Sequence, residues 1–184
     1  MTAPAIRPAT DADLAALRAL IPAAVRGLSR GFYSDAQIES AIAHLFGPDT
    51  QLIADATYLV AEIDGALAGC GGWSRRATLY GGDQWKGAAD PLLDPATDAA
   101  RIRAFFVHPD FARRGVGSAI LRACAAAAAA AGFRSLELVA TLPGEPLYRA
   151  HGFEARERTE AVLPDGMKLP VVRMVRGTGT VVNG

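Results

Sequence analysis

The residues with the clearest chemical meaning form the run Arg113-Arg114-Gly115-Val116-Gly117-Ser118, between an apolar segment and an alanine-rich one. Glycines at a helix start let backbone amides approach a ligand closely, because no side chain intervenes. The first amides of a helix have no intrahelical acceptor and lie at the positive end of its dipole, so they attract anions. The two arginines add fixed positive charge suited to a pyrophosphate. The run therefore predicts a phosphate-binding turn.

Two well-known phosphate motifs do not fit this run. A P-loop needs Gly-Lys-Ser/Thr, and the segment Val116-Gly117-Ser118 lacks the lysine. A dinucleotide fingerprint needs a third glycine and an opening strand–helix–strand unit, whereas position 120 is isoleucine. For the run taken alone, a glycine-bearing helix start that binds nothing is the open alternative.

The elements that must position the turn follow from periodicity and from local signals such as the capping box at Ser34 and Gln37 and the hairpin turn Asp64-Gly65. Strands are expected near residues 5–7, 58–63, 66–73, 102–107, 136–140, 153–161 and 169–175, and helices near residues 14–21, 38–45, 116–131 and 145–150. The order βααβββαβαββ predicts an α+β (or α/β) three-layer domain. We expect residues 1–176 to form this single domain and residues 177–184 to be a C-terminal tail.

Composition narrows the class of protein. The formal net charge is +0, so the basic footprint of a general nucleic-acid binder is missing. Cys70 and Cys124 lack C-x-x-C spacing and the three histidines are scattered, which predicts buried thiols, no metal site and a cytoplasmic location. The most apolar stretch, residues 123–131, is short of the roughly 20 residues that a membrane span needs. We expect no nucleic acid and no membrane among its partners.

Two segments resemble the GNAT acetyltransferase superfamily. One is the run Phe105-Phe106-Val107-His108-Pro109-Asp110-Phe111-Ala112-Arg113-Arg114-Gly115-Val116-Gly117, which is similar to the family's central strand and pyrophosphate loop. The other is Leu147-Tyr148-Arg149-Ala150-His151-Gly152-Phe153, similar to its tyrosine-bearing helix followed by Gly-Phe. With the matching element order, the resemblance covers the chain to about Arg176 and implies the GNAT-like acyl-CoA N-acyltransferase fold with a mixed central sheet.

The resemblance implies a role for each motif. Backbone groups of Phe106 and Val107 would pair with the pantetheine arm of acetyl-CoA, and the segment Arg113 to Ser118 would hold its pyrophosphate. An amine would attack the thioester directly, and Tyr148 would give a proton to the departing thiolate, since a phenol can serve as a general acid. Two positions depart from the family pattern: Ala112 where Gln or Arg is usual, and Thr141 where many members carry asparagine.

The sequence does not single out a general base for the acceptor amine. Glu62, Asp83, His108 and Glu145 are all candidates, and a chain of water molecules to bulk solvent could serve instead. For His108, which precedes a proline at a strand end, stabilisation of a turn is the simpler role.

The long segment between residues 74 and 99 is the best place for acceptor specificity. Long loops are often functional, and this one mixes aromatic, acidic and basic residues with a Gly-Gly pair. We expect Trp73, Tyr80, Asp83 and Trp85 to line the amine pocket, with Arg75 or Arg76 holding an anionic group. A surface loop anchored by an aromatic residue is the alternative.

The sequence thus predicts an acetyl-CoA-dependent N-acetyltransferase acting on a primary amine of a small molecule or peptide, and a possible homodimer. The alternatives are a non-catalytic acyl-CoA sensor of the same fold and a domain that binds no cofactor.

Overall fold

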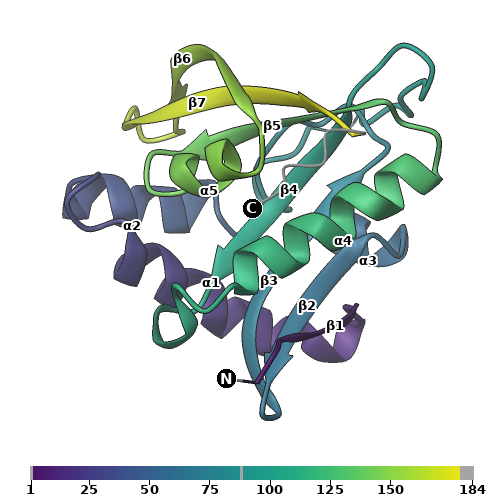
Figure 1. The fold of residues 1–184 in the computed structure, drawn as a ribbon. Helices are drawn as coiled ribbons and strands as arrows, with labels where there is room; N and C mark the ends of the chain where they lie inside the picture. The colour runs from purple at the N-terminus through teal and green to yellow at the C-terminus, as the bar shows by residue number, and fades with distance from the viewer. Residues whose placement is uncertain (1, 88, 179–184) are drawn as a thin grey trace.

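The computed structural model describes residues 2–87 and 89–178, which form a seven-stranded sheet covered by helices on both faces (Figure 1). The strands are β1 (Ala5–Pro8), β2 (Tyr58–Ile63), β3 (Ala66–Ser74), β4 (Ala100–Val107), β5 (Ser135–Thr141), β6 (Glu154–Val162) and β7 (Lys168–Gly177). The α-helices are α1 (Leu14–Leu28), α2 (Asp35–His44), α3 (Thr50–Ala54), α4 (Val116–Ala130) and α5 (Glu145–Ala150), with 3₁₀ turns η1 (Asp11–Asp13) and η2 (Pro109–Phe111).

The strand order in the sheet is β1-β2-β3-β4-β5-β7-β6. Every neighbouring pair is antiparallel except β4 and β5, which are parallel and pair only at Ala100–Leu136 and Arg101–Glu137. From Ile102 onward β4 therefore has no strand partner on the side of β5. This unpaired edge lies in the middle of the sheet, which is where the fold can admit a ligand.

A β-bulge in β4 accompanies this separation. Cys70 pairs with Phe106 and Gly72 with Arg103, so β4 carries one residue more than β3 between these pairs. Ala104, inside the bulge, has a φ of 53°, a backbone conformation that costs energy for any residue with a Cβ atom. Bulges bend a strand and increase its twist, so this one helps to turn the end of β4 away from β5.

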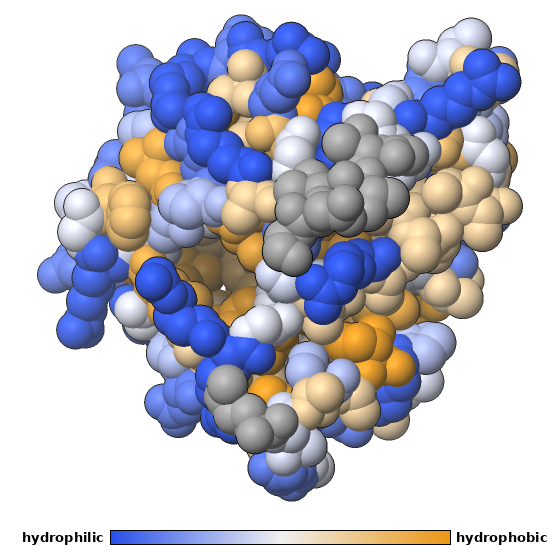
Figure 2. Space-filling model, in the orientation of Figure 1, coloured by the Kyte–Doolittle hydropathy of each residue, from blue (hydrophilic) through white to orange (hydrophobic). Residues whose placement is uncertain are grey.

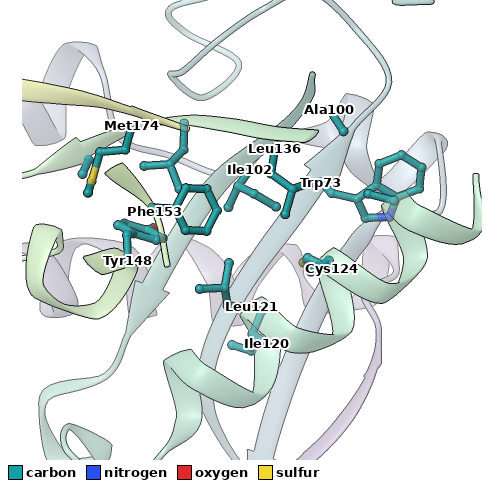
Figure 3. Packing of buried hydrophobic residues seen from close by; sticks show 14 of the residues in the cluster. Trp73, Ala100, Ile102, Ile120, Leu121, Cys124, Leu136, Tyr148, Phe153 and Met174 are labelled. Atoms are coloured by element: carbon teal, nitrogen blue, oxygen red, sulfur yellow. The ribbon is translucent and has the colours of Figure 1, made fainter. Parts of the chain in front are cut away.

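Two hydrophobic clusters hold the layers together. One lies under α4 and α5 and includes Ile120, Cys124 and Tyr148 (Figure 3). The other lies under α1, α2 and α3 and includes Leu17, Ile38 and Leu52. The alanines of α4 present a smooth face, and Val116 Cγ1 lies only 2.9 Å from where a Cβ atom on Gly69 of β3 would sit. The glycine at this position thus lets α4 pack closely on the sheet.

The predicted fold is confirmed, with differences in detail. The Asp64-Gly65 hairpin is present, with both residues at positive φ. Helix α3 was not predicted because five residues are too few to show helical periodicity; Asp49 caps it by accepting a hydrogen bond from the Leu52 amide at 3.2 Å. Strand β7 extends to Gly177, and residues 179–184 of the predicted tail lie outside the described residues.

Replacing Tyr33 with phenylalanine is expected to lower the free energy of unfolding by about 1–3 kcal/mol. The buried Tyr33 hydroxyl donates to the Pro170 carbonyl at 2.6 Å and accepts from the Leu142 amide at 2.9 Å, so its loss leaves both groups without this partner. Denaturant unfolding measures the change. Tyr148→Phe is the matched control, because the Tyr148 hydroxyl makes no hydrogen bond within residues 2–87 and 89–178; equal effects of the two changes would contradict this account.

Candidate active site

The turn before α4 has the geometry of an anion site. Gly115 caps α4 with a φ of 79°, and Arg113 also has a positive φ, 64°. A Cβ atom on Gly115 would meet nothing within 4 Å, so the space beside the cap is open. Among the described residues, the amides of Val116, Gly117 and Ser118 have no hydrogen-bond acceptor, and the first bond of the helix is Ala119 N to Gly115 O at 2.9 Å. These amides are available to a phosphate.

A packing contact that the sequence did not reveal explains why residue 117 is a glycine. A Cβ atom at this buried position would lie 2.9 Å from Leu147 Cδ2, so the glycine lets α5 pack against the first turn of α4. The predicted anion-binding turn and the tyrosine-bearing helix are therefore positioned by direct contact between the two motifs.

No described acidic side chain neutralises the arginines of the turn. Within the described ranges, neither Arg113 nor Arg114 forms an ion pair, and the Arg114 guanidinium lies 5.2 Å from the centre of the Phe111 ring. The Ser118 hydroxyl lies 2.8 Å from Nε2 of His151. Burial lowers the pKa of His151, and nearby arginines lower it further, so its ring is neutral near pH 7. The ring thus adds no positive charge to the turn, whose charge comes from the two arginines and the start of α4.

A cavity opens where β4 separates from β5, next to the predicted catalytic tyrosine. Its walls come from the end of α2, the loop around residue 80, β4, β5 and α5. The lining residues are Leu45, Phe46, Gly47, Tyr80, Gly81, Gly82, Ile102, Arg103, Ala104, Phe105, Phe106, Val139, Thr141 and Tyr148. In the space-filling view, a hollow with apolar walls lies on the face that carries α5 and the start of α4 (Figure 2).

Tyr148 reaches the cavity from α5 with its ring fixed by two aromatic neighbours. The ring packs edge-on against Phe105, with centroids 6.1 Å apart, and against Phe153 at 5.7 Å. Burial raises the pKa of Tyr148 well above its ordinary value of 10.0, and Cys124 raises it further. The phenol therefore keeps its proton across the neutral range.

The four sequence candidates for a general base all lie outside the cavity lining. Glu62 pairs with Arg7 at 2.6 Å, and Glu145 with Arg158 at 2.8 Å. His108 accepts the Asp110 amide at 3.2 Å, which is the turn-stabilising role expected for a histidine before a proline. Of the described lining residues, only Tyr80, Arg103 and Tyr148 have ionisable side chains, so the cavity wall supplies no carboxylate or imidazole.

The predicted acceptor loop is brought to the cavity only in part. Tyr80 lines the cavity, and Trp85 stacks on Tyr80 with ring centroids 5.7 Å apart. Asp83 instead accepts the Thr50 amide at 3.0 Å, where it caps α3. Trp73 is 5% exposed and packs on Phe133, at the opposite end of the core cluster from Tyr148 (Figure 3).

These placements correct the expected pocket. Trp73 does not line it because its side chain points into the core from β3, and the Asp83 carboxylate is bound to backbone away from its lining. Arg75 lies over the Trp73 ring at 5.3 Å, and Arg76 pairs with Asp55 at 2.7 Å, so neither is placed to hold an anion in the cavity.

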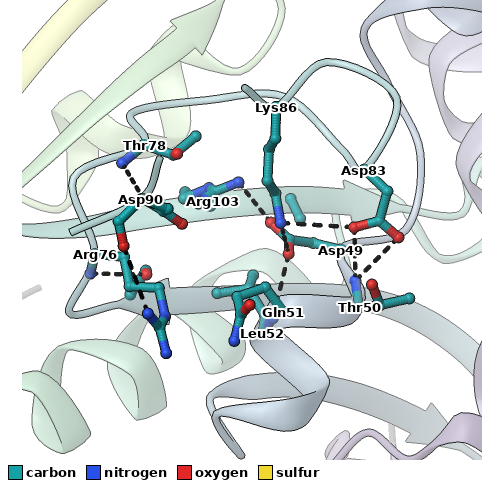
Figure 4. Close-up of polar contacts among 12 residues, drawn as sticks. Asp49, Thr50, Gln51, Leu52, Arg76, Thr78, Asp83, Lys86, Asp90 and Arg103 are labelled. Atoms are coloured by element: carbon teal, nitrogen blue, oxygen red, sulfur yellow. Dashed lines mark hydrogen bonds and ion pairs between the residues drawn. The ribbon is translucent and has the colours of Figure 1, made fainter. Parts of the chain in front are cut away.

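A buried ionic cluster beside the cavity was not predicted. Asp49, which is 0% exposed, accepts from Arg103 Nη2 at 2.6 Å and from Lys86 (Figure 4). Arg103 Nη2 also donates to the Gly81 carbonyl at 2.9 Å. One signal could have revealed this cluster: Arg103 is a charge in the middle of a strand otherwise made mostly of apolar residues, and a buried charge requires a partner.

Comparison with known proteins places the chain in a family. The model of an acetyltransferase (GNAT) domain matches residues 54–155, more than half of the chain. The chain therefore belongs to the GNAT acetyltransferase family. No curated protein matches the sequence.

Several solved structures share the fold. A GCN5-related N-acetyltransferase from Rhodopseudomonas palustris is 24% identical with a TM-score of 0.72, over 96% of this chain and 97% of that one. PaiA N-acetyltransferase from Thermoplasma acidophilum, in complex with coenzyme A, is 14% identical with a TM-score of 0.64, over 96% and 99%. YncA from Salmonella typhimurium, with its cofactor acetyl-CoA, is 19% identical with a TM-score of 0.60, over 100% and 98%.

Two kinds of feature are absent from the described residues. None of their helices is long and apolar enough to cross a membrane. They also contain no group of three or more His, Cys, Asp or Glu side chains arranged to hold a metal ion.

Proposed function

We propose that this chain is an acetyl-CoA-dependent N-acetyltransferase that transfers the acetyl group directly to a primary amine of a small molecule or peptide. The observation that carries the proposal is the separation of β4 from β5, which leaves a strand edge free between the open turn at Gly115 and the buried Tyr148. The proposed anion site, the free strand edge and the proton donor thus lie in the same order along the protein as the pyrophosphate, the pantetheine arm and the thioester lie along acetyl-CoA.

The residues present fit that ligand. Amides of residues 114–118 would bind the pyrophosphate, with Arg113 and Arg114 adding positive charge. The His108 amide donates to Ala68 of β3 at 2.9 Å, so by the alternation of a strand the backbone groups of Phe106 also face β3 and those of Val107 face the free edge. The groups of Val107 can pair with an extended pantetheine as an added strand would. When bound, acetyl-CoA supplies an activated acyl group at the cavity.

The chain's own part in the chemistry is to bind both substrates and to move protons. The largely apolar walls of the cavity would surround the thioester, and Tyr148 would give its proton to the thiolate that leaves. Because the described lining residues include no carboxylate or imidazole, the amine would pass its proton to water on the way to bulk solvent. This proposal therefore assigns no side chain as the general base.

Release of free thiol from acetyl-CoA, measured over a panel of amines, tests the proposal. We expect amine-dependent thiol release together with calorimetric binding of coenzyme A. Binding without release for any amine would favour a non-catalytic acyl-CoA sensor, the alternative function. Lack of coenzyme A binding at millimolar concentration would overturn both functions.

Gly115→Val is expected to weaken coenzyme A binding at least about tenfold, because a branched side chain would project into the open space where the phosphates are proposed to lie. Gly65→Val is the matched control: Gly65 also has a φ of 79° and open surroundings, but it lies in the β2–β3 turn. Both changes carry the same backbone strain, so calorimetry isolates the effect on binding. Equal affinities for the two variants would contradict the assignment of this turn.

A further inference from the structure

Arg103 has hydrogen-bonding capacity that the protein does not use. The side chain of this cavity-lining residue is 0% exposed. Its Nη2 donates to Asp49 and to the Gly81 carbonyl, whereas Nε and Nη1 are buried and have no partner among the described residues. A buried N–H without an acceptor is costly, and for a charged group more so. Such free donors at a cavity wall indicate a ligand that supplies the acceptors.

The charges around Arg103 favour an anionic ligand. Asp49 is shared between Arg103 and Lys86, so one buried carboxylate faces two cations. Asp83 lies 3.6 Å from Lys86, but its side chain is 44% exposed, so solvent screens this contact and Asp49 is the buried carboxylate that both cations share. Arg103 is the only charged side chain among the described lining residues. An acceptor with an additional ammonium group would meet this guanidinium with no carboxylate in the wall to offset it.

Arg103 lies close to the residue that is proposed to act as proton donor. Arg103 and Tyr148 line the same cavity, so one small molecule bound in it can reach both the guanidinium and the proton donor.

We infer that the acceptor is a small amine that also carries a carboxylate, bound by the free donors of Arg103 while its amino group faces Tyr148. The inference rests on the proposed function and names the substrate class of that same cavity. Charge-assisted hydrogen bonds to the guanidinium would hold the carboxylate. The reaction would form an N-acetylamino acid and free coenzyme A, and the amine proton would go to water.

The test compares amino acids with their own carboxamides. The purified chain is incubated with acetyl-CoA and each member of a panel of α- and ω-amino acids, beside the matching primary amide and a set of uncharged aliphatic amines. We expect kcat/KM for the preferred acid to exceed that of its amide by about ten- to hundredfold. An α-carboxamide lowers the pKa of the amine and so raises the fraction of neutral nucleophile, which biases the comparison against the expected result.

Two substitutions assign the preference to Arg103. Arg103→Met should bring the acid-to-amide ratio close to one, with coenzyme A affinity retained. Arg101→Met is the matched control, because Arg101 lies on the same strand and pairs with Glu137 at 2.5 Å, outside the described cavity lining; its ratio should stay that of the unchanged chain. If Arg103→Met does not fold, Arg103→Lys keeps a cation beside Asp49 and should still reduce the ratio about tenfold.

The outcomes separate the two proposals. An acid preference that disappears with Arg103 supports the inference. Acetylation of amides or uncharged amines as efficiently as of acids, or an unchanged ratio in a folded Arg103 variant, overturns the inference and leaves N-acetyl transfer standing. Absence of thiol release with every amine overturns the proposed function and the inference together.

Discussion

Replacing Tyr148 with phenylalanine is expected to lower kcat for acetyl transfer by roughly 10²–10⁴-fold, the usual contribution of a positioned general acid. The ring would keep its contacts with Phe105 and Phe153, so only the proton donor is lost. Because burial raises the pKa of Tyr148, the donor is protonated at any pH near neutrality. The loss should therefore be the same at pH 7 and at pH 9.

Steady-state kinetics and calorimetry measure this effect together. Coenzyme A affinity and unfolding stability should stay close to those of the unchanged chain, because the Tyr148 hydroxyl has no hydrogen-bond partner within residues 2–87 and 89–178. Tyr80→Phe, which alters the other tyrosine of the described lining, is the matched control and should leave kcat within a few-fold. If Tyr148→Phe kept full kcat, Tyr148 would be a packing residue and another group would protonate the thiolate.

Asp49→Asn is expected to destabilise the protein strongly, by about 3–5 kcal/mol of unfolding free energy. The change is nearly isosteric, so it tests charge alone. Asp49 is 0% exposed and is the only carboxylate that meets Arg103 among the described residues. Its neutralisation would leave the buried Arg103 guanidinium without a counter-charge and Lys86 with only the exposed Asp83.

Urea denaturation of Asp49→Asn beside Asp83→Asn isolates the effect of burial. Asp83 also caps α3 and faces Lys86, but its side chain is 44% exposed. Asp83→Asn should therefore lower the free energy of unfolding by about 1 kcal/mol or less. Similar losses for the two variants would mean that the cluster in Figure 4 behaves as a surface ion pair.

The sequence predicted those parts of the fold that depend on local signals. The capping box at Ser34 and Gln37 precedes α2, and the Asp64-Gly65 turn joins β2 to β3. The turn at Gly115 begins α4 at Val116 as expected. Each of these depends on residues within a few positions of one another, which a sequence displays directly.

The missed features depend on contacts between distant segments. Arg103 and Asp49 are 54 residues apart, and the sequence around either residue does not indicate that the two form an ion pair. The left-handed conformation of Ala104 arises from the bulge between β3 and β4, not from a local preference of alanine. Trp73 adjoins the acceptor loop in sequence, which suggests a place in the amine pocket, yet its position on β3 directs it into the core.

The most direct test of the central claim is mass spectrometry of both the amine and the protein after incubation with acetyl-CoA. Direct transfer predicts an N-acetylated amine that accumulates one for one with free coenzyme A, while the protein mass stays unchanged at every time point. An acetylated protein that forms before the product, or coenzyme A binding without any N-acetylated amine, would contradict the account.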